Sequence, residues 1–175
     1  MKKLTFILFM LCTVLASAQN WKSSYEEALS ISKAENKPIV LVFAGSDWCA
    51  PCIRLERSIW QSKAFVSYSN EHYVLYKADF PRKKTNQLAA DVKEQNNKLA
   101  KTYNPNGHFP LVVLLNSNEK VLGNTGYKKL SPDEYISLLN TFVKWKNLSP
   151  WFLSFLSLQD LGKSVNTWRS IGPKN

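Results

Sequence analysis

The chain has 175 residues, 45% of them hydrophobic, so it can bury one sizeable core without a set of structural disulfides. Its formal net charge is +10, yet no binding pattern of interleaved basic and aromatic residues accompanies this charge, which argues against nucleic-acid binding. The excess charge instead favours acidic partners or an anionic membrane surface.

The first eighteen residues have the pattern of a secretory signal peptide. Lys2 and Lys3 precede an almost wholly apolar run over residues 4–15, and Ala16-Ser17-Ala18 forms a small-residue cleavage motif. We therefore expect residues 1–18 to be removed, which lowers the formal charge to +8, and the mature protein to be exported to the periplasm.

Strands and helices are expected to alternate through a single domain spanning residues 19–146. Helices are predicted near 24–36, 50–60, 62–70, 85–103 and 131–145, and strands near 38–44, 73–79, 111–115 and 121–127. The last two strands can pair as a hairpin, and Ser131-Pro132-Asp133-Glu134 reads as a capping box. The basic run Arg82-Lys83-Lys84 is predicted to be a solvated loop.

Residues 147–175 form a tail with a strongly apolar stretch over 151–156, which is too short to span a membrane. Two interpretations stay open for this tail. It is either an extra helix laid on the domain or an exposed docking element.

The motif Trp48-Cys49-Ala50-Pro51-Cys52 follows a buried strand and opens a helix. Two cysteines at this spacing can close and reopen a disulfide without a cofactor. Free backbone N–H groups and the helix dipole favour an anion at Cys49, so we expect the pKa of its thiol to fall below the usual ~8.5. Cys49 is thus predicted to attack the substrate, and Cys52, expected to be more shielded, to resolve the mixed disulfide.

A metal site is the main alternative for this pair, and the sequence argues against it. A zinc site needs four ligands, and neither of the two histidines, His72 and His108, has ligand spacing to the cysteines. A c-type haem motif would need histidine where Ile53 stands. We therefore predict no metal and no cofactor. A copper-delivery protein and a client-binding adaptor or chaperone with idle thiols stay open as other functions.

The strand, the cysteine motif, the helix and a later Phe109-Pro110 before a strand resemble the thioredoxin superfamily over about residues 22–145. Leu55-Glu56 and Phe65 are most similar to exported members and to the C-terminal domain of inner-membrane thiol:disulfide interchange reductases.

This resemblance implies an α/β thioredoxin fold with a central four- to five-stranded mixed sheet flanked by helices, and an insertion, residues 81–107, before the cis-proline strand. It implies that Pro110 is cis beside the cysteines, and that Trp48, Phe109 and Pro110 bind the substrate chain. It also implies a monomeric enzyme that acts on protein thiols and disulfides in the reducing direction and is kept reduced by a membrane electron donor.

One departure from the family concerns the proton acceptor for the resolving thiol. Thioredoxins carry a buried aspartate six positions before the first cysteine, where this chain has Phe43. Glu56 lies four residues after Cys52 on the same helix face and is the predicted substitute, hence a third catalytic residue. The alternative is a solvated glutamate paired with Arg54, Arg57 or Lys77, and both interpretations stay open.

Overall fold

The structure is a computed structural model of the chain, and it describes residues 20–147. The predicted signal peptide lies outside the described residues. So does the predicted tail, apart from its first residue. No helix within residues 20–147 is long and apolar enough to cross a membrane.

Four strands form one mixed sheet, as the resemblance implied, and their order is β2-β1-β3-β4. The central strand β1 (Ile39–Ala44) is parallel to β2 (Val74–Asp79) and antiparallel to β3 (Leu111–Leu115), which pairs antiparallel with β4 (Val121–Thr125). An isolated parallel bridge joins Trp21 to Leu75 beside the outer edge of β2.

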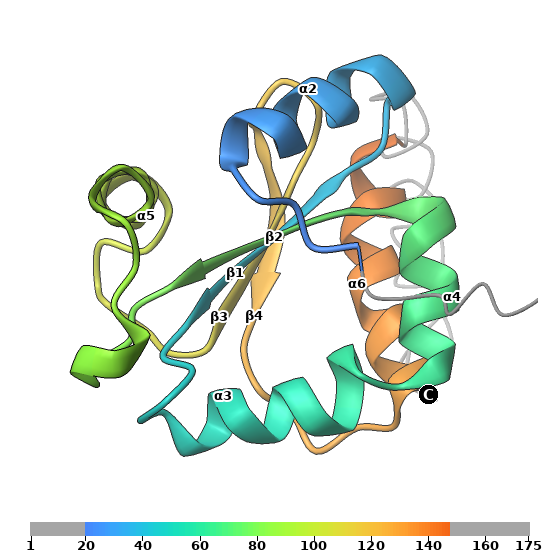
Figure 1. Cartoon of the computed structure of the whole chain (residues 1–175). Helices are drawn as coiled ribbons and strands as arrows, with labels where there is room; N and C mark the ends of the chain where they lie inside the picture. The colour runs from blue at the N-terminus through green and yellow to red at the C-terminus, as the bar shows by residue number, and fades with distance from the viewer. Residues whose placement is uncertain (1–19, 148–175) are drawn as a thin grey trace, which may run out of the picture.

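Helices cover both faces of the sheet (Figure 1). On one face lie α2 (Tyr25–Glu35) and α5 (Ala90–Tyr103), and on the other lie α3 (Ala50–Leu55), α4 (Lys63–His72) and α6 (Pro132–Asn147). Every residue of β1 is buried, and its side chains alternate between the two layers. Phe43, at the position of the missing aspartate, is fully buried in the layer of α2 and α5.

Side-chain caps define several helix starts at the predicted places. The hydroxyl of Ser24 accepts the N–H of Glu27 at 3.1 Å, and that of Ser62 accepts the N–H of Phe65 at 3.2 Å. At the start of α6, the Glu134 carboxylate accepts the backbone N–H of Ser131 at 2.8 Å, which confirms the capping box.

Two predicted helices differ from the observed ones. The helix expected over 85–103 begins only at Ala90, because Lys84–Asn86 form a 3₁₀ turn (η2), Gln87 has extended backbone and Ala89 is not helical. The helix expected over 50–60 is α-helical only to Leu55 and continues as a π-helix, η1 (Glu56–Trp60). The segment between β2 and the cis-proline strand, expected as an insertion, contains η2 and α5.

The sheet brings three connections to one edge. The parallel strands β1 and β2 both end there, and the antiparallel strand β3 begins there. The cysteine motif follows β1, the basic run follows β2, and Phe109-Pro110 precedes β3, so residues far apart in the sequence meet at this edge.

Candidate active site

Cys49 and Cys52 form a disulfide with a Cα–Cα distance of 5.2 Å. Cys49 is the N-cap of α3, and its Sγ accepts the backbone N–H of Cys52 at 3.2 Å. The sulfur of Cys49 therefore lies where the unpaired N–H groups of the helix point, the arrangement that stabilises a thiolate. Both cysteines are buried to a similar degree in this oxidised form, with 4% of Cys49 and 6% of Cys52 exposed, so the expectation that Cys52 is the more shielded is not confirmed.

Contacts on several sides hold the indole of Trp48 beside the disulfide. Its Nε1–H donates to the Phe80 carbonyl at 2.8 Å, and its ring centroid lies 5.4 Å from that of Phe109 in an edge-to-face contact. The Arg82 guanidinium lies 3.8 Å from the Trp48 ring centroid. Gly45 leaves room for the ring, because a Cβ there would lie 2.3 Å from Cε2 of Trp48. No pattern in the sequence alone reveals this role of Gly45.

The Phe109–Pro110 peptide bond is cis, as the resemblance implied. A buried amide braces the loop before it: Asn104 Nδ2 donates to the His108 carbonyl at 2.9 Å, and Asn104 Oδ1 accepts the His108 N–H at 2.8 Å. Pro110 is buried and Phe109 half-buried at the edge where the disulfide lies. The structure thus places Trp48, Phe109 and the cysteines together, and Asn104 orders the approach to Pro110.

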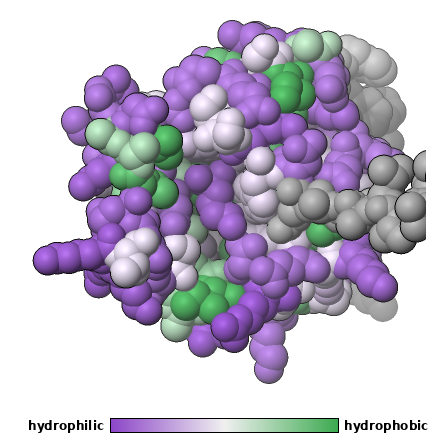
Figure 2. Space-filling model, in the orientation of Figure 1, coloured by the Kyte–Doolittle hydropathy of each residue, from purple (hydrophilic) through white to green (hydrophobic). Residues whose placement is uncertain are grey.

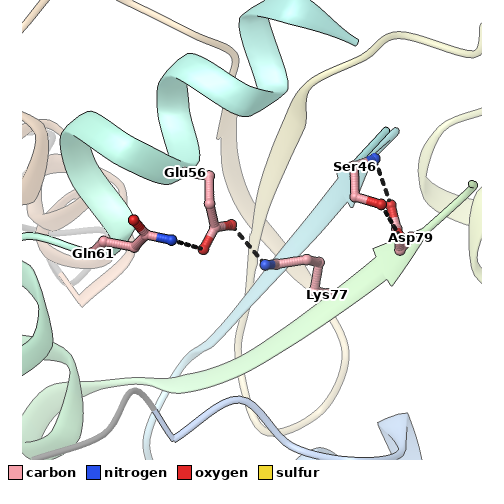
Figure 3. Close-up of polar contacts among 5 residues, drawn as sticks. All are labelled: Ser46, Glu56, Gln61, Lys77 and Asp79. Carbon is pink, nitrogen blue, oxygen red and sulfur yellow. Dashed lines mark hydrogen bonds and ion pairs between the residues drawn. The ribbon is translucent and has the colours of Figure 1, made fainter. Parts of the chain in front are cut away.

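Glu56 forms an ion pair with Lys77 of β2, with 2.6 Å between Oε2 and Nζ (Figure 3). Both side chains are about three-quarters buried, with 28% and 26% exposed. Gln61 Nε2 lies 3.5 Å from the other carboxylate oxygen, and the Lys77 ammonium lies 4.6 Å from the Trp21 ring centroid. Of the candidate partners, Lys77 is therefore the one that pairs with Glu56.

A surface pocket connects this ion pair with the disulfide. Its lining includes Cys52, Glu56 and Lys77, together with Ser46, Arg57 and Gln61. Glu56 and Cys52 therefore line the same solvent-accessible space.

Asp47 anchors the segment that follows β2. Its carboxylate accepts the backbone N–H groups of Arg82 and Lys83, each at 2.9 Å, and the side-chain amide of Asn86 at 3.1 Å. The bond from Arg82 is the main reason why the pKa of this carboxyl lies below its usual range. This role could not be predicted from local sequence, because the residues whose N–H groups Asp47 accepts are 35 to 39 positions away.

Ser46 forms a second link between the turn after β1 and the chain at the end of β2. Its backbone N–H donates to Asp79 at 2.9 Å and its hydroxyl at 2.5 Å, which joins the turn after β1 to the end of β2 (Figure 3). Within residues 20–147, no group of three or more histidine, cysteine, aspartate or glutamate side chains is arranged to hold a metal ion.

Residues 20–117 match the sequence profile of a family described as thioredoxin-like. The disulfide bond reductase DsbH of Chlamydia pneumoniae is 34% identical over 131 residues, which cover 75% of this chain and 76% of that protein. The thioredoxin-related protein DsbJ of Chlamydia pneumoniae is 25% identical over 129 residues, 70% of this chain but 36% of DsbJ. A solved structure of a DsbH oxidoreductase superposes with a TM-score of 0.67 and 33% identity, covering 75% of this chain and 90% of the other.

Proposed function

This chain belongs to the thioredoxin-like family, and we propose that it is an exported enzyme that reduces disulfide bonds in other proteins. Its class is thiol:disulfide oxidoreductase, and its similarity to a disulfide bond reductase supports the reducing direction. The observation that carries the proposal is the position of Cys49 Sγ at the N-terminus of α3, bonded to Cys52 and accepting its N–H.

In the proposed cycle, the reduced enzyme starts with the Cys49 thiolate. This thiolate attacks one sulfur of a substrate disulfide, the substrate S–S bond breaks, and the released substrate thiolate takes a proton. Cys52 then loses its proton and attacks Cys49 Sγ, which frees the second substrate thiol and leaves the Cys49–Cys52 disulfide. The substrate has gained two electrons, and a thiol donor at the membrane restores the enzyme dithiol.

Glu56 is the proposed acceptor of the Cys52 proton. It lines the same pocket as Cys52, and its ion pair with Lys77 keeps the carboxylate there while the pair stays partly open to solvent. Asp and Glu can serve as general bases when they lie within reach of the proton, directly or through one water.

The Glu56→Gln variant tests this role through the pH dependence of thiol alkylation in the reduced protein. We expect the alkylation profile of Cys52 to shift, because the charge that faces it is removed. Glu94→Gln is the matched control, since it removes one glutamate from an exposed ion pair with Lys98 on α5. An unchanged profile in Glu56→Gln would contradict this role and leave Glu56 only as the ion-pair partner of Lys77.

Trapping tests the reductase proposal itself. The Cys52→Ser variant lacks the resolving thiol, so substrates should stay attached to Cys49 through a disulfide that dithiothreitol releases. Cys49→Ser is the control and should trap nothing. If Cys52→Ser captures no protein covalently, while Cys49→Ser still binds clients without a covalent bond, the chain is an adaptor or chaperone. Tight copper binding by the reduced protein, without disulfide reduction, would instead indicate metal delivery.

Export, the periplasmic location and the monomeric state are further parts of the proposal. The charged start, the apolar run and the cleavage motif of residues 1–18 support export. Expression of the full chain followed by fractionation and N-terminal sequencing should give a periplasmic protein that begins at Gln19. Light scattering of that protein should give the mass of one chain, and a cytosolic protein with an intact N-terminus would contradict the proposed location.

A further inference from the structure

Arg82, Lys83 and Lys84, which we call the basic rim, follow the end of β2 and lie near the start of α3, in the lower left of Figure 1. All three residues are exposed. The sequence alone indicates a solvated loop, as is usual for a short run of basic residues.

The structure shows that this loop is fixed to the active-site turn. Three hydrogen bonds from the loop end on the carboxylate of Asp47, two residues before Cys49 in the chain. Trp48, the residue between them, carries the Arg82 guanidinium on its ring and donates to the Phe80 carbonyl. The position of the basic rim relative to the disulfide is therefore set by direct contacts rather than by chance.

The charges of the rim are left available to a partner. Within residues 20–147, no side chain of the rim forms an ion pair with a carboxylate, since the ion pairs there involve other residues. The carboxylate of Asp47 accepts backbone and amide N–H groups of this loop rather than an ion pair from its charged side chains, and Lys83 attracts it only at longer range. The face seen in Figure 2 is mostly hydrophilic, with hydrophobic residues in small separate areas. A client polypeptide would find no large apolar surface on this face, so charged side chains are the groups that can recognise it.

We propose that the basic rim is a specificity element that binds an acidic side chain of the client polypeptide close to its reacting cysteine. The inference rests on the proposed function. A client chain that passes over Trp48 and Phe109 beside Pro110 comes next to Arg82. An extended chain advances about 3.3 Å per residue, so an acidic residue two to four positions from the client cysteine can reach the rim. The stack on Trp48 orders the Arg82 guanidinium before binding, which reduces the entropy lost on contact with a carboxylate.

The test uses peptides with one internal disulfide that differ only in having Glu, Gln or Lys two positions from the attacked cysteine. The reduced wild-type protein should react fastest with the Glu peptide and slowest with the Lys peptide. At low ionic strength, we expect the rate constants for the Glu and Gln peptides to differ by about threefold to tenfold, and the difference to shrink as salt is added.

Two variants and one control localise the effect. In Arg82→Gln/Lys83→Gln the Glu-to-Gln ratio should fall towards one, and Lys83→Glu/Lys84→Glu, which keeps the Arg82 stack, should reverse the order so that the Lys peptide reacts fastest. The control Lys33→Gln/Lys120→Gln removes two exposed charges from the opposite end of the sheet and should keep the wild-type ratio. An equal fall in this control would mean that net charge is responsible, and would overturn the proposal.

A binding measurement separates this inference from the proposed function. Fluorescent versions of the peptides, with serine in place of cysteine, are titrated into the oxidised protein, and the same preference for Glu is expected in their dissociation constants. A preference in binding without any disulfide reduction would contradict the reductase proposal and support the rim. Reduction of all peptides with no preference would overturn the rim alone, as would rim-dependent binding to anionic phospholipid vesicles with no peptide preference.

Discussion

Gly45→Ala is the change whose effect follows most directly from the geometry of the site. The added Cβ would lie 2.3, 2.5 and 2.6 Å from Cε2, Nε1 and Cζ2 of Trp48. Ordinary contact begins near 3.4 Å, so the indole must withdraw by about 1 Å. Gly45 does not have a positive φ, so alanine adds no backbone strain and the clash with the ring is the main effect.

The cost can be worked from what the ring loses. Its hydrogen bond to Phe80 is worth about 1 kcal/mol, its contact with Phe109 about 0.5–1.5 kcal/mol, and its stack under Arg82 about 0.5–1 kcal/mol. Alanine recovers about 0.4–1 kcal/mol by restricting the unfolded chain. We therefore expect Gly45→Ala to lower the free energy of unfolding by about 2 kcal/mol, within the usual range for overpacking.

A double-mutant cycle with Trp48→Ala tests the cause. Urea denaturation of the oxidised proteins, followed by far-UV circular dichroism, gives the free energy of unfolding of each variant. Without the indole, the alanine at position 45 has nothing to displace, so adding Gly45→Ala to Trp48→Ala should be neutral or slightly stabilising. If Gly45→Ala costs as much in that background as in the wild type, the clash with Trp48 is not the reason.

Two further predictions concern buried polar groups. Asn104→Ala should lower the free energy of unfolding in urea by about 1–3 kcal/mol, because it removes both hydrogen bonds to His108. Asn104→Asp should cost at least as much, because a buried carboxylate oxygen would then face the His108 carbonyl with no hydrogen to donate, and a loss well below about 1 kcal/mol in both variants would contradict the brace. Burial, with a smaller effect of Glu26, raises the pKa of Tyr76 to about 12. The protonated phenol therefore contributes to the free energy of unfolding in full below pH 10. This contribution falls by about 1 kcal/mol by pH 11 and is lost as the pH rises through 12. The fall in melting temperature from pH 9 to 11 should therefore be smaller in Tyr76→Phe, and an identical fall would refute this assignment.

The strands could be predicted because buried strands have a recognisable local composition. β1 and β3 are short apolar runs, and both occur within one residue of the predicted bounds, as central strands buried on both faces do. The predicted start of α5 was wrong because polar, helix-prone residues carry little information about where a helix begins. No hydroxyl or carboxylate caps this helix at Ala89, so the usual signal for a start is missing.

The cysteine pair could be located from its spacing and neighbours, and the cis-proline from the resemblance to the thioredoxin superfamily. Asp47 and Gly45 could not, because each acts on residues brought near by folding. The carboxylate of Asp47 contacts a segment that follows another strand, and the space that Gly45 leaves is filled by a ring whose orientation depends on Phe80 and Phe109. Such roles depend on which connections lie together at one edge of the sheet, and no local sequence pattern predicts this.

Helix geometry alone narrows the choice of ion-pair partner for Glu56 but does not identify it. Arg57 and Arg54 lie one position after and two before it, and residues at these separations on a helix do not face each other, so neither is favoured as its partner. Arg54 in fact lies over the Tyr127 ring, 5.5 Å from its centroid. Lys77 is the remaining candidate, but its position depends on the register that sets it opposite Val42 in the parallel pair of β1 and β2. A shift of one residue in that register would turn Lys77 towards the layer of α2 and α5, where Phe43 lies, and would leave Glu56 without a counter-charge beside Cys52. The acid and its partner thus depend on strand pairing, even though Glu56 itself belongs to the helical segment that begins at the cysteines.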